Sequence, residues 1–183
     1  MSESSNTKTP FLALADYEKR SLVHAVGLPE QIQAQGAWSG IGFRLGELYL
    51  LVSLKEVAEI LHLPPMTTVP GSKAWLMGIA NVRGNLVAVV DLRGFLIGQR
   101  TKLSDSSRVL VIRQEGGNVG LLIDEVLGQR HLFDDDNSDQ GGFEETIVAP
   151  FVHRGYRKDD IEWGVFDSIQ LTQTTEFLQA AAA

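Results

Sequence analysis

An acidic run in the last third of the chain holds the residues with the clearest potential for metal chemistry. Its oxygen-bearing side chains fall at the first, third, fifth and twelfth positions of a calcium-binding EF-hand loop: Asp134, Asp136, Ser138 and Glu145. The sixth position of such a loop needs glycine for its sharp bend, but Asp139 stands there. The run is therefore interpreted as an acidic connection, with a calcium- or ligand-binding β-barrel protein kept as an alternative function.

The composition offers little for catalysis. The chain has no cysteine, which excludes disulfides, thiolate metal sites and cysteine nucleophiles. Its four histidines are scattered without the spacing of a metal site: His24, His62, His131 and His153. Neither a serine nucleophile elbow nor a glycine-rich phosphate loop occurs. The sequence thus predicts a protein that is not an enzyme and needs no cofactor.

Glu59 and Arg83 are the charged pair best suited to recognition. Each lies between apolar residues in a segment predicted to be a strand or a turn, where a charge faces solvent or a partner. The simpler interpretation is a pair of solvated charges on the outer face of the strands. Arg83 also precedes Gly84-Asn85, a pair typical of tight hairpin turns, so its guanidinium is expected to reach another surface.

The elements that would position these residues are mostly short strands. β-Branched and apolar residues between 78 and 91 predict a hairpin around Gly84-Asn85. The other predicted strands are 41–45, 48–52, 58–63, 108–113, 119–126, 151–156 and 161–166. Short helices are predicted at 72–77, 91–97 and 168–180.

The beginning of the chain has a different pattern. Apolar residues spaced by three and four after Thr9-Pro10 predict an amphipathic helix that ends at Gly27, and a second short helix is predicted after Pro29. Residues 1–8 are polar and predicted to be disordered.

Many short strands separated by glycine turns predict a mainly β fold built of small barrels or sandwiches. Two segments, 87–92 and 162–169, each run from a strand through an aspartate toward a helical turn. This similarity indicates a weak internal duplication and favours two similar barrels side by side.

Charge and length exclude several classes of partner. The 183 residues carry a formal net charge of -7, which disfavours nucleic acid as a partner and argues against an oligonucleotide-binding barrel. Neither a signal peptide nor an apolar stretch long enough to cross a bilayer is evident, so direct membrane insertion is not expected. A cytoplasmic protein is predicted.

Taken in order, several segments resemble the CheW domain of chemotaxis coupling proteins. The most specific are Gly78-Ile79-Ala80-Asn81-Val82-Arg83-Gly84 and Val89-Val90-Asp91-Leu92-Arg93, and others lie at 42–52, 57–60 and 120–126. The resemblance covers about residues 38–178, which leaves a helical extension at 9–37 and a tail at 179–183.

This resemblance implies two five-stranded, SH3-like β-barrels packed through a shared apolar core, between an N-terminal helical extension and a C-terminal helix. It also implies an adaptor that couples the cytoplasmic tip of a methyl-accepting chemoreceptor to the regulatory domain of a CheA-type histidine kinase. The resemblance places the partner-binding surface at Val57, Glu59, Ile60, Asn81, Val82, Arg83 and Gly84. Glu59 and Arg83 are expected to pair there.

The N-terminal extension and the 38–44 segment resemble the branch of the family that serves type IV pilus systems. That branch implies a PilJ-like chemoreceptor, a CheA-like hybrid kinase and twitching motility as the output. A coupler of flagellar chemotaxis is the alternative within the family.

Overall fold

The computed structural model describes residues 10–24, 38–114, 116–138 and 142–180, and the chain divides into a unit of residues 1–35 and a unit of residues 36–183. In the first unit, helix α1 spans Pro10–His24, in agreement with the predicted amphipathic helix. Asp16 and Arg20 form an ion pair of 2.9 Å along it. Thr9, Gly27 and the second helix predicted after Pro29 lie outside the described residues.

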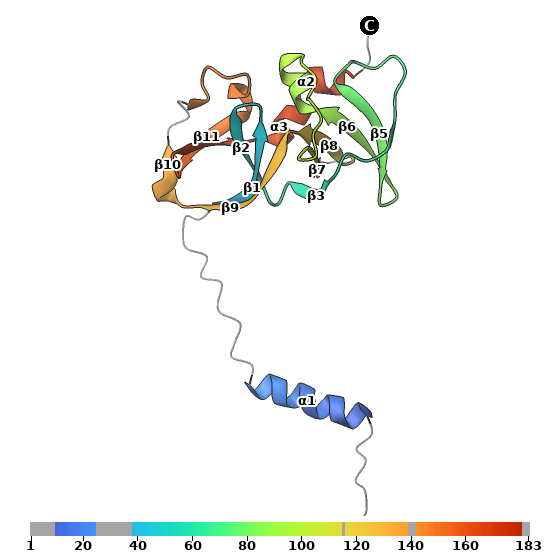
Figure 1. Ribbon diagram of the computed structural model, residues 1–183, viewed down its shortest axis with the longest axis vertical. Coiled ribbons are helices and arrows are strands. Elements are labelled where there is room, and N and C mark those ends of the chain that lie inside the picture. Colours follow the sequence, from blue (N-terminus) through green and yellow to red (C-terminus); the bar gives the residue numbers. More distant parts are fainter. Residues whose placement is uncertain (1–9, 25–37, 115, 139–141, 181–183) are drawn as a thin grey trace, which may run out of the picture. The chain divides into compact units, whose positions relative to one another are not determined.

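The second unit contains two mixed β-sheets, which form the two lobes seen in Figure 1. The sheet of the first lobe has the order β10-β11-β12-β2-β1-β9. Its strands are β1 Trp38–Leu45, β2 Leu48–Ser53, β9 Glu125–Leu132, β10 Asn137–Ser138, β11 Val152–Lys158 and β12 Ile161–Phe166.

The sheet of the second lobe has the order β3-β7-β8-β6-β5-β4. Its strands are β3 Val57–Leu61, β4 Met66–Thr67, β5 Leu76–Val82, β6 Asn85–Asp91, β7 Arg108–Ile112 and β8 Val119–Ile123. Each described sheet therefore has five strands of five or more residues, as the family resemblance implied, and a sixth strand of two residues at one edge.

The two lobes repeat one topology. In the first lobe, β12 of the β11–β12 hairpin pairs in parallel with β2, and β1 and β9 follow β2 across the sheet. In the second lobe, β6 of the β5–β6 hairpin pairs in parallel with β8, and β7 and β3 follow β8 across the sheet. The outer strands are exchanged between the lobes. β3 follows β2 of the first lobe in the chain but lies in the sheet of the second lobe, and β9 follows β8 of the second lobe but lies in the sheet of the first. This arrangement supports the predicted internal duplication and ties the lobes together.

Equivalent helices follow the equivalent strands. Helix α2 (Leu92–Ile97) follows β6 and is capped by Asp91, while α3 (Ser168–Thr172) follows β12 and is capped by Asp167. An N-terminal aspartate satisfies backbone N–H groups that the first turn of a helix leaves free. A last short helix, α4, spans Thr175–Leu178, and one-turn 3₁₀ helices span Asp134–Asp136 (η1) and Ala149–Phe151 (η3).

Three apolar clusters hold the second unit together. The shared core lies between the lobes and takes side chains from both sheets and from the C-terminal helices, among them Phe43, Leu50, Leu110, Ile123 and Leu171. A smaller cluster fills each lobe. On β7 and β8 alternate residues enter the shared core and the second-lobe cluster, so both faces of these strands are buried. This explains their continuous apolar runs.

Several predicted elements are wrong in detail. Residues 72–77 do not form a helix: β5 begins at Leu76, and Trp75 packs on Phe95 and Phe177. The helix predicted at 168–180 is two short helices that meet at Gln173 and Thr174. The strand predicted at 119–126 ends at Ile123 as β8. The chain then crosses to the other sheet and continues as β9, a separate strand that was not predicted.

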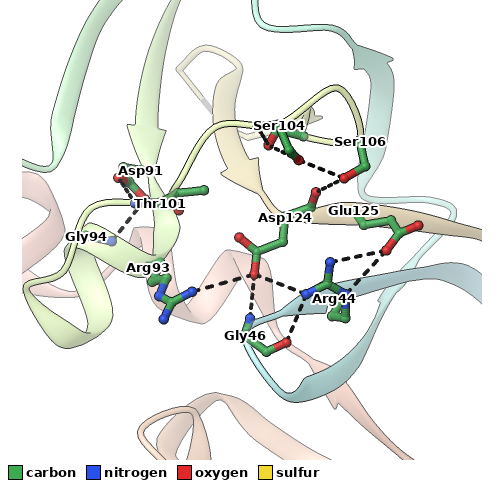
Figure 2. A network of polar contacts seen from close by, with 11 residues as sticks. Arg44, Gly46, Asp91, Arg93, Gly94, Thr101, Ser104, Ser106, Asp124 and Glu125 are labelled. Atoms are coloured by element: carbon green, nitrogen blue, oxygen red, sulfur yellow. Dashed lines mark hydrogen bonds and ion pairs between the residues drawn. The ribbon is translucent and has the colours of Figure 1, made fainter.

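A polar joint closes the seam between the lobes (Figure 2). Asp124 lies between β8 and β9 and accepts a hydrogen bond of 2.6 Å from the Gly46 N–H in the β1–β2 turn. Arg44 of β1 donates to Glu125 at 3.2 and 3.3 Å. Arg93 of α2 approaches Asp124 from the second lobe. The joint thus links the two sheets at the point where the chain crosses between them.

Candidate functional site

Arg83 lies at the tip of the β5–β6 hairpin. The register places Val82 opposite Asn85, so Arg83 and Gly84 form the two-residue turn, with φ of 51° and 88°. The sequence predicted Gly84-Asn85 as the turn, which is one residue too late, because Asn85 already belongs to β6. Left-handed backbone is uncommon for a residue with a large side chain. An arginine in that position is consistent with selection for its side chain.

Asn81 supports this turn from within β5. Its Oδ1 accepts a hydrogen bond of 2.8 Å from the Gly84 N–H. Asparagine side chains stabilise tight turns through such local bonds to the backbone. Asn81 was predicted to lie at the partner-binding surface; the residue is exposed, and its Oδ1 bonds to the turn that carries Arg83.

Glu59 and Arg83 pair as expected. The Nε and Nη2 atoms of Arg83 donate to the same Glu59 oxygen at 3.0 and 2.8 Å. The Arg83 side chain is 79% exposed and that of Glu59 is 23% exposed. Hydrogen bonding and the charge of Glu59 raise the pKa of Arg83 above its ordinary value. The pair therefore presents a fixed cation with free donor capacity toward solvent.

The pair also connects distant parts of one sheet. Glu59 lies on β3 at one edge, whereas Arg83 follows β5, and β7, β8 and β6 intervene in the sheet order. The sheet must curl for these side chains to meet. Glu59 and Arg83 consequently fix the hairpin tip against the edge strand β3, and the position of Arg83 depends on the closure of the second lobe.

Exposed apolar side chains lie on the elements that carry the pair. Ile60 on β3 is 37% exposed, but it follows Glu59 directly in the strand and so faces the opposite side of the sheet. Ile79 and Leu86 on the hairpin are 38% and 76% exposed. Leu86 lies opposite Asn81, and Ile79 lies two residues before Asn81, so these three share one face of the hairpin. Ile79 and Leu86 were not predicted as site residues. Their alternation with buried Ala80 and Val87 was the signal that could have identified them.

The remaining predicted site residues have other surroundings. Val57 is half-buried and packs against the shared core, while Val82 is half-buried against the second-lobe cluster. Gly84 is exposed at the turn. The structure thus brings Glu59, Arg83, Asn81 and Gly84 together at the hairpin tip and gives the two valines a packing role.

A groove of about 690 Å³ lies near the other end of β3. It is lined by Arg113, Gln114, Ile169, Thr172, Gln173 and Leu178. Arg113 donates hydrogen bonds to the backbone oxygens of Lys55 and Val57, which fixes the start of β3 beside the groove. Ile169 and Leu178 are 41% and 70% exposed, so the groove offers apolar contact area.

Glu56 provides a titratable contact beside α3. Its Oε2 accepts a hydrogen bond of 2.5 Å from the fully buried Ser168 hydroxyl. Burial raises the pKa of Glu56 above its ordinary value, an effect that the Ser168 bonds oppose. Glu56 therefore joins the segment between β2 and β3 to the C-terminal helices.

The acidic run adopts local structure in its described part. Asp134–Asp136 form η1, and the Phe133 N–H donates to the Asp136 carboxylate at 3.0 Å. Asp139 lies outside the described residues. Across the described ranges, no group of three or more histidine, aspartate or glutamate side chains is placed to hold a metal ion. None of the described helices is long and apolar enough to span a bilayer.

Comparisons with known proteins agree with this architecture. The CheW-like domain model matches residues 39–173. Protein PilI of Pseudomonas aeruginosa is 40% identical over 177 residues, 97% of this chain and 99% of that protein. A probable chemotaxis protein CheW of Rhizobium etli is 33% identical over 93 residues, which are 50% of this chain and 59% of that protein.

A solved structure supports the fold. The scaffolding protein TtCheW of Thermoanaerobacter tengcongensis superposes with a TM-score of 0.65 at 24% identity. The match covers 76% of this chain and 94% of TtCheW.

Proposed function

The chain belongs to the CheW-like domain family, and from this premise we propose that it is a non-catalytic adaptor that couples a methyl-accepting chemoreceptor to a CheA-type histidine kinase. One observation carries the proposal for this chain. Arg83 is held at an exposed hairpin tip by Glu59, beside the exposed Ile79 and Leu86. A charge fixed next to apolar contact area is typical of recognition surfaces, where apolar groups supply affinity and charges set register.

The receptor is proposed to contact this surface through its helical cytoplasmic tip. The residues proposed to shape the surface are Val57, Glu59, Ile60, Asn81, Val82, Arg83 and Gly84. Val57 and Val82 act from beneath, by packing the strands that carry the others. The kinase is proposed to bind through its regulatory domain. Association of this kind needs neither a metal nor a cofactor, and the adaptor works in the cytoplasm against the membrane-anchored receptor.

The pathway is proposed to be type IV pilus-mediated twitching motility, with a PilJ-like receptor. The supporting observation is the extent of similarity. The match to PilI spans 97% of this chain, including the segment before β1, whereas the match to the Rhizobium etli CheW spans 50%. A flagellar chemotaxis coupler is the alternative, and it predicts binding to a flagellar-type receptor tip in preference to a PilJ-like one.

Isothermal titration calorimetry with a purified PilJ-like receptor tip and a CheA-type regulatory domain tests the proposal. Arg83→Glu is expected to weaken receptor binding by at least roughly ten-fold, because the reversed charge would repel the receptor group that Arg83 attracts. Arg157→Glu is the matched control, since Arg157 is also an exposed arginine paired with a glutamate, on the equivalent hairpin of the first lobe. Equal effects of the two reversals would contradict the assignment of the receptor surface.

A further inference from the structure

The outer face of the β5–β6 hairpin carries large apolar side chains in contact with solvent. Ala80 and Val87 are buried in the second-lobe cluster, so Ile79 and Leu86, which alternate with them, lie on the other face of the sheet. Ile79 is 38% exposed and Leu86 is 76% exposed. Antiparallel strands usually carry polar residues on a face that meets water. The outer face of this hairpin departs from that pattern.

The equivalent hairpin of the first lobe shows that the fold accepts polar residues at such positions. In the second cross-strand pair from its two-residue turn, Arg157 lies opposite Glu162. In the corresponding pair of the β5–β6 hairpin, Asn81 lies opposite Leu86. Arg157 and Glu162 form an ion pair on a partly exposed surface. A charged residue thus occupies the position of Leu86 in the repeated topology, so the exposed leucine indicates a contact with another molecule.

The spacing of the two apolar residues fits an α-helix. Ile79 lies opposite Ala88, two residues beyond Leu86 on the same strand, so Ile79 and Leu86 are diagonal neighbours. Diagonal neighbours on an antiparallel pair are about 7 to 8 Å apart, and side chains one turn apart on a helix are about 5 to 6 Å apart. A helix that crosses the hairpin along this diagonal can therefore pack one aliphatic side chain on each residue.

The apolar face is continuous with the Arg83 turn. Leu86 follows the turn by two residues, and Asn81, on the same face as Leu86, accepts the hydrogen bond of 2.8 Å from the Gly84 N–H within the turn. A partner that contacts Arg83, whose side chain is 79% exposed, is therefore within reach of Leu86. Among the proposed partners, the one assigned to this tip is the helical end of the chemoreceptor.

We propose that a helix of the chemoreceptor tip crosses the outer face of the β5–β6 hairpin and packs two aliphatic side chains, one turn apart, on Ile79 and Leu86. These contacts supply affinity, while Arg83 sets the register of the helix. The inference rests on the proposed function and extends it, because it names two further contact residues and gives the spacing of the receptor residues that meet them.

Calorimetry of the full chain with a PilJ-like receptor tip tests the two contacts. Leu86→Gln should weaken binding by roughly ten-fold or more, because the contact loses buried apolar area. Ile79→Thr keeps the β-branch and should weaken binding less. Leu103→Gln is the control, since Leu103 is 56% exposed and lies outside the hairpin. Equal urea midpoints confirm the folding of the variants.

The outcomes separate this inference from the proposed function. If the wild type binds the receptor tip and Leu86→Gln binds equally well, the helix contact is wrong and the coupling function stands. If Leu86→Gln weakens binding to a CheA-type regulatory domain and not to the receptor tip, the face belongs to the kinase and the inference is also wrong. If the wild type does not bind the receptor tip, the proposed function fails and the inference fails with it.

Spin labels test the path of the helix. The chain has no cysteine, so Thr67→Cys and Asn85→Cys each provide a single attachment site. Thr67 is exposed and lies opposite Ile79, and Asn85 is exposed and precedes Leu86. The two labels should broaden the amide signals of one receptor helix at centres at least one turn apart, and a label at Leu103→Cys should broaden none. Broadening on two different helices, or none from either label, would overturn the proposal.

Discussion

Asp91 should contribute more to stability than its counterpart Asp167, although both cap a short helix after equivalent strands. The Asp91 residue is 3% exposed, and its carboxylate accepts three hydrogen bonds. One comes from the Gly94 N–H at 3.0 Å, and two come from the Thr101 N–H and hydroxyl at 2.8 and 2.7 Å. Asp91 therefore caps α2 and also anchors the loop that leads to β7.

The magnitude follows from these bonds. Hydrogen bonds to a charged group contribute about 1.5 to 3 kcal/mol each, and loss of a helix cap costs about 1 kcal/mol. The bonds of one carboxylate are not additive, so Asp91→Ala should lower the free energy of unfolding by about 3 to 5 kcal/mol. The Asp167 carboxylate accepts the exposed cap bond from the Gln170 N–H at 2.7 Å and lies 3.6 Å from His153 Nε2. Asp167→Ala should cost about 1 kcal/mol.

Urea unfolding monitored by tryptophan fluorescence measures both variants under one condition. The slope of free energy against urea should be the same for the wild type and both variants, because the surface exposed on unfolding is unchanged. Equal losses for the two substitutions, or a larger loss for Asp167→Ala, would refute the argument that burial and the Thr101 anchor distinguish the two caps.

Three other substitutions test separate features. Arg83→Gly should change the urea midpoint little, because glycine adopts a φ of 51° more readily and this gain offsets the loss of the exposed ion pair to Glu59, while receptor binding by calorimetry falls; a clear loss of stability would contradict the description of the turn. Gly120→Ala should cost about 1 to 3 kcal/mol in urea unfolding, because an added Cβ would lie 2.7 Å from Val109 Cγ1, and an unchanged midpoint would show that the strands relax. Glu56 has a raised pKa in the folded state, so its contribution to stability is fully present below its ordinary pKa of 4.5 and is lost as pH rises through the folded value. The free energy of unfolding of Glu56→Gln, relative to that of the wild type, should therefore increase as the pH rises from acid to neutral. A difference between the two proteins that does not change with pH would refute this.

Local sequence signals predicted the elements whose stability is local. The 78–91 hairpin, the 41–52 hairpin and the helical turn after Asp91 all carry their own strand formers, turn glycines or cap. The turn was misplaced by one position because Gly-Asn is one of the pairs typical of tight hairpin turns, whereas an arginine in left-handed backbone is not expected. The register of the two strands decides the turn, and register depends on which face is buried.

Long-range packing decided the elements that the sequence did not predict. β9 carries a left-handed Gly128 and several charged residues, and it forms by pairing with β1, which lies about 85 residues earlier in the chain. A helix was predicted through Trp75, yet Trp75 lies in a turn, where it stacks on Phe177 and meets Phe95 edge to face. No local pattern encodes such contacts.

The candidate site was predictable only in part. The charged residues Glu59 and Arg83 were identified from their apolar surroundings, but their pairing came from the family resemblance, because the two positions meet only when the second-lobe sheet curls. A cleft of about 320 Å³ at the seam between the lobes was not predicted at all, because its walls come from residues near 46, 96 and 147, which are far apart in the sequence.

The most direct test of the central proposal is a bridging assay. A PilJ-like receptor tip is immobilised, a CheA-type regulatory domain is added in solution, and retention of the kinase domain is measured with and without this chain. The coupling account predicts retention only when the chain is present, and loss of retention with Arg83→Glu but not with Arg157→Glu. Retention that is independent of the chain, or none when the chain is present and folded, would contradict it.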